Sequence, residues 1–360
     1  MYAKGLQLIP LSHDRFVLKR GIHELLVSGP TVRAVIEPLV AMLDGTRSRE
    51  QLLAVFSGDL RPEADQLLTA LVKRGLVFGH ATQASVALVD DSLQAAFYDN
   101  FGPMGQNAPE RLRRATVLIV GVNLIARALV RGLLECGVGK VMLVEHPILS
   151  NHVAPFPWTT GIRDNGSPAF LPQTMADRLV LCDELPDDTA LRDVSLMCAT
   201  SDFGEAEALL QVNRLALRVE KVFLPIWLTE MRGYVGPLNY PHETACLRCY
   251  HLRADSNNPR YEIGRAIRKH ITNDLAARQT TGFLSPMPSV LGEIATMEVV
   301  KCLGEFVPSD TVGRLIEINL VAFSSAVRRV LKIPRCPDCS DQTVRAPMAL
   351  TRGPQIPQRG

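Results

Sequence analysis

The chain has 360 residues and a formal net charge of +2, which argues against a strongly basic nucleic-acid-binding surface. Hydrophobic residues make up 47% and charged residues 21% of the chain, which is typical of a globular protein, and the length favours two or three domains. The N-terminus has no apolar core long enough for a signal peptide, and no apolar run is long enough for a membrane span. We therefore expect a cytoplasmic protein that binds neither nucleic acid nor membrane.

In the first segment, residues 1–79, the spacing of the apolar residues changes once, from a pattern typical of strands to a pattern typical of helices. Three short apolar runs predict an antiparallel meander: "LQLIPLS", "RFVLKRG" and "HELLVSG". After Pro30 the apolar residues recur at helical spacing in three stretches. Ser48 and Gln51 form a capping-box pattern for the second helix, and Pro62 marks the first turn of the third. The segment is thus predicted to be a winged-helix-like domain of three strands and three helices.

Residues 80–114 have the composition of a connector. "LQAAFYDNFG" predicts one short helix, and "GPMGQNAPE" is rich in turn formers. The last twenty residues, 341–360, have no periodicity and predict a disordered tail.

Strands and helices alternate between residues 115 and 340. "VLIV", "KVMLVE", "SLMCAT" and "KVFLPIWL" are buried-strand patterns, and helical patterns begin at Leu124 and near Gly204 and Ser289. "GRLIEINL" and "SSAVRRVLKI" are predicted as late strands. This alternation indicates an α/β domain with a Rossmann-like, doubly wound parallel sheet.

Two CxxC pairs, Cys246 with Cys249 and Cys336 with Cys339, predict a metal site. A CxxC turn directs two thiolates to one point, and two such turns complete the tetrahedral set that zinc takes in structural sites. A redox dithiol or simple burial is the alternative for either pair. The other four cysteines lie in apolar segments and are expected to be buried thiols.

This combination resembles the ThiF/MoeB superfamily, which includes ubiquitin-activating enzymes. The resemblance covers residues 115–340 and is carried by "VLIVG", "GVGKVMLVEHPILSN", "CATSDFGEAEALLQVNRLAL" and "GPLNYPHETACLRC". Residues 1–79 resemble the PqqD-like peptide-recognition domain of ribosomal-peptide biosynthesis. Together the two parts resemble the ocin-ThiF-like or SagC-like partner subunit of azoline-forming cyclodehydratases.

The resemblance implies a scaffold subunit with no catalytic residues of its own. Such a partner binds the leader of a precursor peptide and presents the core peptide to a YcaO-type enzyme. That enzyme uses ATP to activate a backbone amide, onto which a Cys, Ser or Thr side chain cyclises to give a thiazoline or oxazoline. Relatives also imply a homodimer.

An extended peptide can add to the open edge of a meander through main-chain hydrogen bonds. The third strand is the expected edge, and the third helix forms the other wall of the site. The predicted peptide-binding residues are Glu24, Leu25, Leu26, Val27, Leu67, Ala70, Leu71, Lys73 and Arg74. For each leucine, a place in the core is the alternative, and Lys73 and Arg74 are expected to meet acidic leader residues.

The nucleotide site is predicted to be degenerate, with residual positions at Gly121, Asn123, Glu145 and Asp202. Active members of the superfamily carry a glycine cluster after the first strand, because glycines let the backbone approach phosphates. Here Asn123, Leu124 and Ala126 occupy the later glycine positions. Either Ser201 or Asp202 stands at the place of the catalytic aspartate. We therefore expect no ATP in this chain, although an ATP-dependent adenylating enzyme that activates a carboxylate remains the alternative function.

Overall fold

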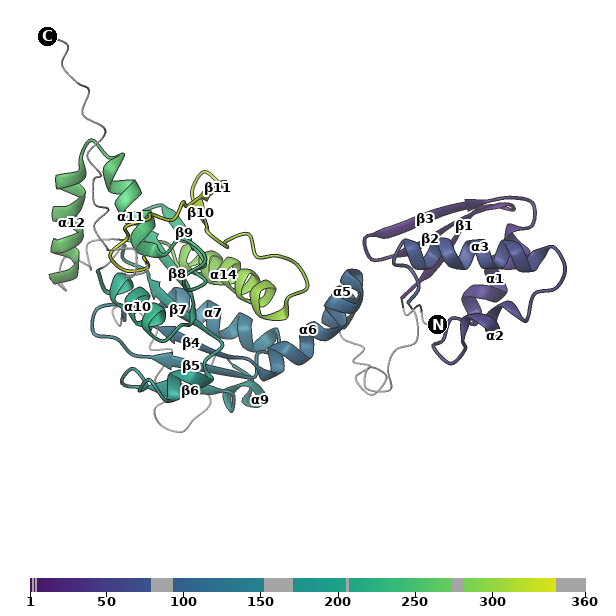
Figure 1. Cartoon of the computed structure of the whole chain (residues 1–360), viewed down its shortest axis with the longest axis horizontal. Coiled ribbons are helices and arrows are strands. Elements are labelled where there is room, and N and C mark those ends of the chain that lie inside the picture. The colour runs from purple at the N-terminus through teal and green to yellow at the C-terminus, as the bar shows by residue number, and fades with distance from the viewer. Residues whose placement is uncertain are drawn as a thin grey trace, which may run out of the picture. The chain divides into compact units, whose positions relative to one another are not determined.

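The computed structural model describes residues 1, 3, 5–78, 93–151, 171–204, 207–273 and 282–340. These residues form two compact units (Figure 1). Unit 1 comprises Met1–Arg114 and Val300–Pro308, and unit 2 comprises Ala115–Val299 and the residues from Ser309 onward. The predicted tail, residues 341–360, and the first part of the predicted connector lie outside the described residues.

Unit 1 begins with the predicted three-strand, three-helix arrangement. Its antiparallel sheet has the order β1-β2-β3, with β1 (Gln7–Ser12), β2 (Arg15–Arg20) and β3 (His23–Ser28). The helices are α1 (Val32–Ala41), α2 (Arg49–Leu53) and α3 (Leu60–Lys73). The predicted capping box is present at α2, where the Ser48 hydroxyl accepts the Gln51 N–H and the Gln51 side chain accepts the Ser48 N–H.

The core of unit 1 lies between one face of this sheet and the helices. Successive residues of a strand point to opposite faces, so Phe16 and Leu18 of β2 lie inside and are 1% and 0% exposed. They pack in one cluster with Ile36 and Leu39 of α1 and Leu68 of α3. The change from strand period to helical period in the sequence thus matches a two-layer core.

The connector contains more helix than predicted. It includes the expected short helix, α5 (Leu93–Tyr98), and a 3-10 turn, η1 (Asp99–Phe101). The turn predicted at "GPMGQNAPE" is wrong, because these residues begin helix α6 (Gly102–Arg114), which tolerates Pro109 inside it. Ala108 and Leu112, one helical turn apart, are fully buried in α6. Their packing outweighs the turn preference of the individual residues.

Unit 2 is built on an eight-stranded mixed sheet of order β11-β10-β9-β8-β7-β4-β5-β6. Its strands are β4 (Thr116–Val120), β5 (Lys140–Val144), β6 (Leu179–Cys182), β7 (Leu196–Ser201), β8 (Val222–Thr229), β9 (Arg232–Val235), β10 (Arg314–Asn319) and β11 (Ser324–Arg329). The run from β6 to β8 is parallel, and β9, β10 and β11 are added antiparallel. The doubly wound sheet is confirmed, and the sequence patterns missed the short strands β6 and β9.

Helices lie on both faces of this sheet (Figure 1). They are α7 (Leu124–Glu135), α9 (Gln173–Ala176), α10 (Glu207–Arg218), α11 (Leu247–Ser256), α12 (Tyr261–Asn273) and α14 (Pro286–Gly304), with a 3-10 turn η2 (Ala190–Asp193). Helix α14 packs closely on α7, because a Cβ added to Gly292 would lie 2.6 Å from the Ala128 Cβ. The absent side chain thus lets the two helices approach.

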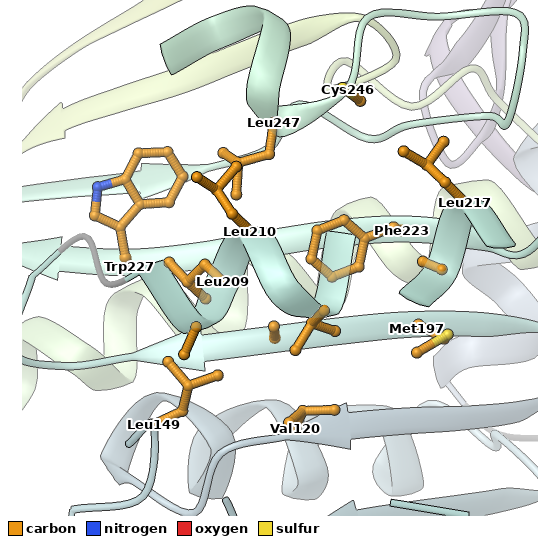
Figure 2. Packing of buried hydrophobic residues seen from close by; sticks show 14 of the residues in the cluster. Val120, Leu149, Met197, Leu209, Leu210, Leu217, Phe223, Trp227, Cys246 and Leu247 are labelled. Atoms are coloured by element: carbon orange, nitrogen blue, oxygen red, sulfur yellow. The ribbon is translucent and has the colours of Figure 1, made fainter. Parts of the chain in front are cut away.

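The opposite face of the sheet carries a large core cluster. Figure 2 shows Leu209 and Leu210 of α10 together with Phe223 and Trp227 of β8. Cys246 belongs to the same cluster, so the predicted metal site is continuous with the hydrophobic core of unit 2. Among the described residues, no helix is long and apolar enough to cross a membrane.

Candidate functional site

The parallel strands change direction of winding between β4 and β7, which is where this type of sheet binds ligands beyond the strand ends. Gly121 follows β4 directly and has a φ of +104°. A Cβ at this position would lie 2.6 Å from the Thr200 carbonyl oxygen and 2.9 Å from the Leu149 Cβ. Gly121 therefore lets the chain turn from strand into helix beside β7.

Asn123 fills the next part of this turn with its own side chain. Its Oδ1 accepts the Ala126 N–H at 3.0 Å, which caps the start of α7. Its Nδ2 donates to the carbonyl oxygens of Leu149 at 3.1 Å and Thr200 at 3.0 Å. The side chain is only 1% exposed, so its polar atoms are used inside the protein.

Asp202 approaches the same helix start from the end of β7. Its Oδ2 accepts the Leu124 N–H at 3.4 Å, and its Oδ1 accepts a hydrogen bond from the Asn151 amide at 3.0 Å. The Val122 N–H is likewise bonded to the Ser150 hydroxyl at 3.0 Å. Three N–H groups around the start of α7, which could otherwise face a phosphate, thus have protein acceptors.

The other residual positions differ in what they contact. Ser201, the alternative to Asp202, is fully buried and donates its hydroxyl proton to the Gly204 carbonyl at 2.7 Å, so it does not face α7. Glu145 is half-buried directly after β5, and its N–H donates to the Cys182 carbonyl at 2.9 Å. The contribution of Ser150 and Asn151 was missed, although the Ser-Asn pair after the second strand was visible in the sequence.

The two CxxC pairs come together although 90 residues separate Cys246 from Cys336. All four Sγ atoms lie within 4.8 Å of one another, and all four side chains are buried. The Sγ atoms of Cys246 and Cys336 are 3.8 Å apart, and those of Cys249 and Cys339 are 3.5 Å apart. Four sulfurs at Zn–S bonds of about 2.3 Å in a tetrahedron are separated by about 3.8 Å. The cluster therefore has the size and the donor set to hold a metal ion.

Surrounding residues hold this cluster in place. The Ile333 N–H donates to the Cys249 Sγ at 3.4 Å. Asn213 of α10 accepts the Leu247 N–H at 3.1 Å and donates to Asp338, within the second CxxC turn, at 3.3 Å. Hydrogen bonding among the four thiols lowers the pKa of Cys249 and Cys336 and raises the pKa of Cys246 and Cys339, because the closely packed sulfurs share their protons.

The predicted peptide-binding residues divide between the surface and the core of unit 1. Leu26 is 53% exposed on β3, and Ala70, Lys73 and Arg74 are exposed or half-buried on and after α3. Leu67 and Leu71 are instead 9% and 0% exposed, within the core. These two leucines face the sheet from the apolar side of α3, so they do not offer a free wall to a ligand.

The remaining predicted positions lie on β3. Glu24 is exposed, whereas Leu25 and Val27 are half-buried and pack against the core from the inner face of the sheet.

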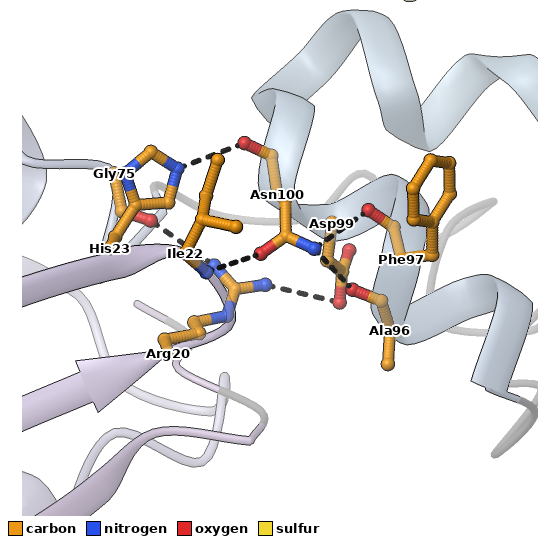
Figure 3. Close-up of polar contacts among 8 residues, drawn as sticks. All are labelled: Arg20, Ile22, His23, Gly75, Ala96, Phe97, Asp99 and Asn100. Atoms are coloured by element: carbon orange, nitrogen blue, oxygen red, sulfur yellow. Dashed lines mark hydrogen bonds and ion pairs between the residues drawn. The ribbon is translucent and has the colours of Figure 1, made fainter. Parts of the chain in front are cut away.

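One end of β3 is attached to the connector (Figure 3). The His23 ring Nε2 donates to the Asn100 carbonyl at 3.0 Å, and the Asn100 Oδ1 accepts the Ile22 N–H at 3.4 Å. Arg20, which is only 5% exposed, forms an ion pair with Asp99 at 3.1 Å. These contacts fix the β2–β3 turn, and in the part of the chain that the structure describes the rest of β3 pairs with β2 alone.

Burial raises the pKa of Asp202 to about 6, against the opposing effect of its hydrogen bonds. The folded protein then holds this proton more tightly than the unfolded chain, so the stabilisation is complete below about pH 4 and is lost as the pH rises through 6. Asp202→Asn removes the titrating group, so it should remove a change of about 2–3 kcal/mol in the free energy of unfolding between pH 4 and pH 7. The stability of the variant should therefore depend less steeply on pH than that of the wild type over this range.

Urea denaturation across this pH range measures the effect. Asp193→Asn is the matched control, because it removes one exposed carboxylate from the same unit. An Asp202→Asn variant whose free energy of unfolding changes with pH as steeply as that of the wild type would contradict the prediction.

Comparison with known proteins agrees with this architecture. Residues 176–341 match the ThiF family model. E. coli MccB superposes with a TM-score of 0.63 at 15% identity, covering 95% of this chain and 97% of MccB. The microcin C7 biosynthetic enzyme MccB in complex with N-formylated MccA gives a TM-score of 0.63 at 14% identity, covering 94% and 99%.

A heterocyclase in complex with substrate and cofactor superposes with a TM-score of 0.59 at 16% identity. The match covers 95% of this chain but only 39% of the heterocyclase chain. No curated protein sequence matches the chain. At these identities the structural matches establish the fold alone. The family match shows in addition that residues 176–341, in unit 2, are related to the ThiF family. Unit 2 of this chain therefore contains a ThiF family domain.

Proposed function

We propose that this chain is a leader-peptide-binding scaffold subunit. It binds a ribosomal precursor peptide through residues 1–78 and presents it to a YcaO-type, ATP-dependent cyclodehydratase that forms thiazoline or oxazoline rings. The observation that carries the proposal is an open sheet edge, β3, in a small domain that precedes a ThiF-like unit. The YcaO-type partner and the homodimer follow from the family resemblance.

The two edges of the small sheet differ in their capacity to accept another strand. On β1, Pro10 lacks an N–H and a register shift follows it, and both features discourage pairing. On β3 there is no proline, and its register with β2 is unbroken from His23 to Ser28. Since β3 pairs with β2 alone among the described residues, its outer main-chain groups are available for strand addition.

The register also indicates which groups a peptide would use. Arg20 and His23 flank a two-residue turn and form its closing pair, whose main-chain groups face each other. By alternation, the N–H and C=O groups of Glu24, Leu26 and Ser28 point away from β2. A bound peptide is expected to pair with these three residues, while Lys73 and Arg74 attract its acidic side chains.

The start of α7 supports a role without adenylation. In a phosphate site the first N–H groups of the helix are left for the ligand. Here Asp202 and Asn123 accept the hydrogen bonds of two such groups, those of Leu124 and Ala126, and Ser150 accepts the N–H of Val122 just before the helix. A nucleotide would have to displace a buried carboxylate and a buried amide, so we propose that the ATP is bound by the partner enzyme.

The heterocyclase comparison fits a division of labour. This chain corresponds to 39% of that chain, so the heterocyclase has a large additional part. We infer that a separate cyclodehydratase supplies the corresponding part for this protein. The alternative is an adenylating enzyme, because E. coli MccB, which has the same fold, has a structure with ATP.

We further propose that the four-cysteine cluster holds a structural zinc ion. Cys246, Cys249, Cys336 and Cys339 would supply all four ligands, so the ion has no open position for a substrate. Its proposed role is to attach the segment after β11 to the start of α11, in addition to hydrogen bonds such as those of Ile333 with Cys249 and of Asn213 with Asp338.

Peptide binding by the full-length chain tests the main proposal. Fluorescein-labelled peptides selected from a random library for binding to this chain serve as probes. Ser28→Pro removes an outward-facing N–H and should weaken binding about tenfold, since a hydrogen bond lost in an added strand also displaces its neighbours. Ser28→Ala is the matched control, because it removes the hydroxyl but keeps the N–H. Failure to select any binder would count against strand addition.

Nucleotide binding separates the scaffold from the adenylating alternative. We expect no ATP binding by calorimetry and no ATP–pyrophosphate exchange, because the Leu124 and Ala126 N–H groups of α7 are already bonded. E. coli MccB provides the positive control in the same assays. Micromolar ATP binding with pyrophosphate exchange would favour the adenylating enzyme.

Metal analysis tests the zinc proposal. The purified protein should contain one zinc ion per chain, and Cys249→Ser should lose it and lower the melting temperature, because three ligands hold the ion less well. Cys182→Ser is the control, a half-buried cysteine outside the cluster. Metal-free wild-type protein with unchanged stability in a chelator would overturn the proposal.

A further inference from the structure

The outer face of the small sheet is unusually apolar. The inner face carries Leu8, Phe16, Leu18, Leu25 and Val27, which pack in the core of unit 1. On the other face, Ile9 is 39% exposed, Leu11 55% and Leu26 53%, and Val17 is half-buried. An antiparallel sheet with one face in the core normally presents polar residues on the other. Apolar side chains on both faces of one sheet require a second explanation.

The strand register arranges three of these residues in a line. Ile9 of β1 pairs with Val17 of β2, and Val17 pairs with Leu26 of β3. This row, Ile9–Val17–Leu26, crosses the whole sheet and ends at the open edge. The next place in the row is empty among the described residues, and only a strand added to β3 would supply it, about 4.8 Å from Leu26.

We propose that this row is a second half of the peptide site, so that a precursor peptide is recognised on both faces of the strand that it adds. This inference rests on the proposed function. Successive residues of an added strand point to opposite faces. Those on the inner side meet the region between β3 and α3, and one on the outer side lies beside Leu26. The expected ligand is therefore an extended peptide in which the residue opposite Leu26 is apolar and points its side chain to the outer face of the sheet.

The width of the apolar strip favours a peptide over a folded partner or a second copy. The next row toward the β2–β3 turn is polar, with Gln7, Lys19 and Glu24. On the other side, Arg15 pairs with Ser28. The strip is one residue wide at β2 and β3, with Leu11 beside it at β1, and is far smaller than the roughly 800 Å² per partner of a stable protein interface. It matches the contribution of one side chain from one added strand.

Leu26→Thr tests the row with little risk to the fold, because threonine suits a strand and this side chain is already half exposed. With a library-selected peptide as the probe, binding to the full-length chain should weaken about tenfold, which corresponds to 1.4 kcal/mol. Ile9→Thr, two strands away, should have a smaller effect. Val55→Thr is the matched control, since Val55 is 59% exposed in the same unit but lies outside the sheet.

Alanine scanning of the peptide supplies the second measurement. Two-sided recognition predicts that alanine substitution of at least one peptide residue that points to the outer face weakens binding to the wild-type chain. The same substitution should not weaken binding to the Leu26→Thr variant, as in a double-mutant cycle. If the wild-type chain binds and Leu26→Thr binds equally well, the inference is wrong while the edge site stands. If no peptide binds the wild-type chain, the proposed function itself fails. Sedimentation that changes with Leu26→Thr in the absence of peptide would instead identify an interface between copies and overturn the inference.

Discussion

The N–H groups at the start of a helix need acceptors, and the ThiF-like unit of this chain supplies them from its own side chains. Asn123 serves the Ala126 N–H and Asp202 serves the Leu124 N–H. Both acceptors are buried, so the arrangement links β4, β7 and α7 into one polar junction inside an apolar sheet. These hydrogen bonds occupy N–H groups at the start of α7, and the proposed division of labour with an ATP-using partner rests on them.

The same junction has an energetic cost, from which we predict its pH dependence. A carboxylate in a buried place is poorly solvated even when it accepts hydrogen bonds from Leu124 and Asn151, and burial accordingly raises the pKa of Asp202. An asparagine at this position would carry no charge and would therefore avoid this cost, but it would also give the junction no dependence on pH.

Unit 1 meets a different constraint, which is the unpaired edge of its sheet. Natural proteins usually protect such edges with proline, bulges or charges. In this chain the β1 edge has a proline and a register shift, whereas β3 combines an unbroken register with an exposed leucine. The polar contacts of Arg20 and His23 with the connector hold the β2–β3 turn (Figure 3), and among the described residues no strand other than β2 pairs with β3. An asymmetric sheet of this kind is well suited to accept one strand on one side.

The sequence by itself determined those elements that can be recognised from the periodicity and spacing of a few neighbouring residues. The three strands and three helices of unit 1, the capping box at Ser48 and the alternation of unit 2 follow from residue patterns a few positions long. The two CxxC pairs predicted a four-cysteine cluster because thiolate spacing is itself the signal.

The tertiary structure decided what depends on distant partners. Helix α6 forms in a turn-like sequence because Ala108 and Leu112 are buried. Strands β6 and β9 are too short to show a period, and their places come from pairing with β5, β8 and β10. Whether Ser201 or Asp202 faces α7 differs by one residue in the sequence, and only the packing of β7 beside β4 turns Asp202 toward the helix.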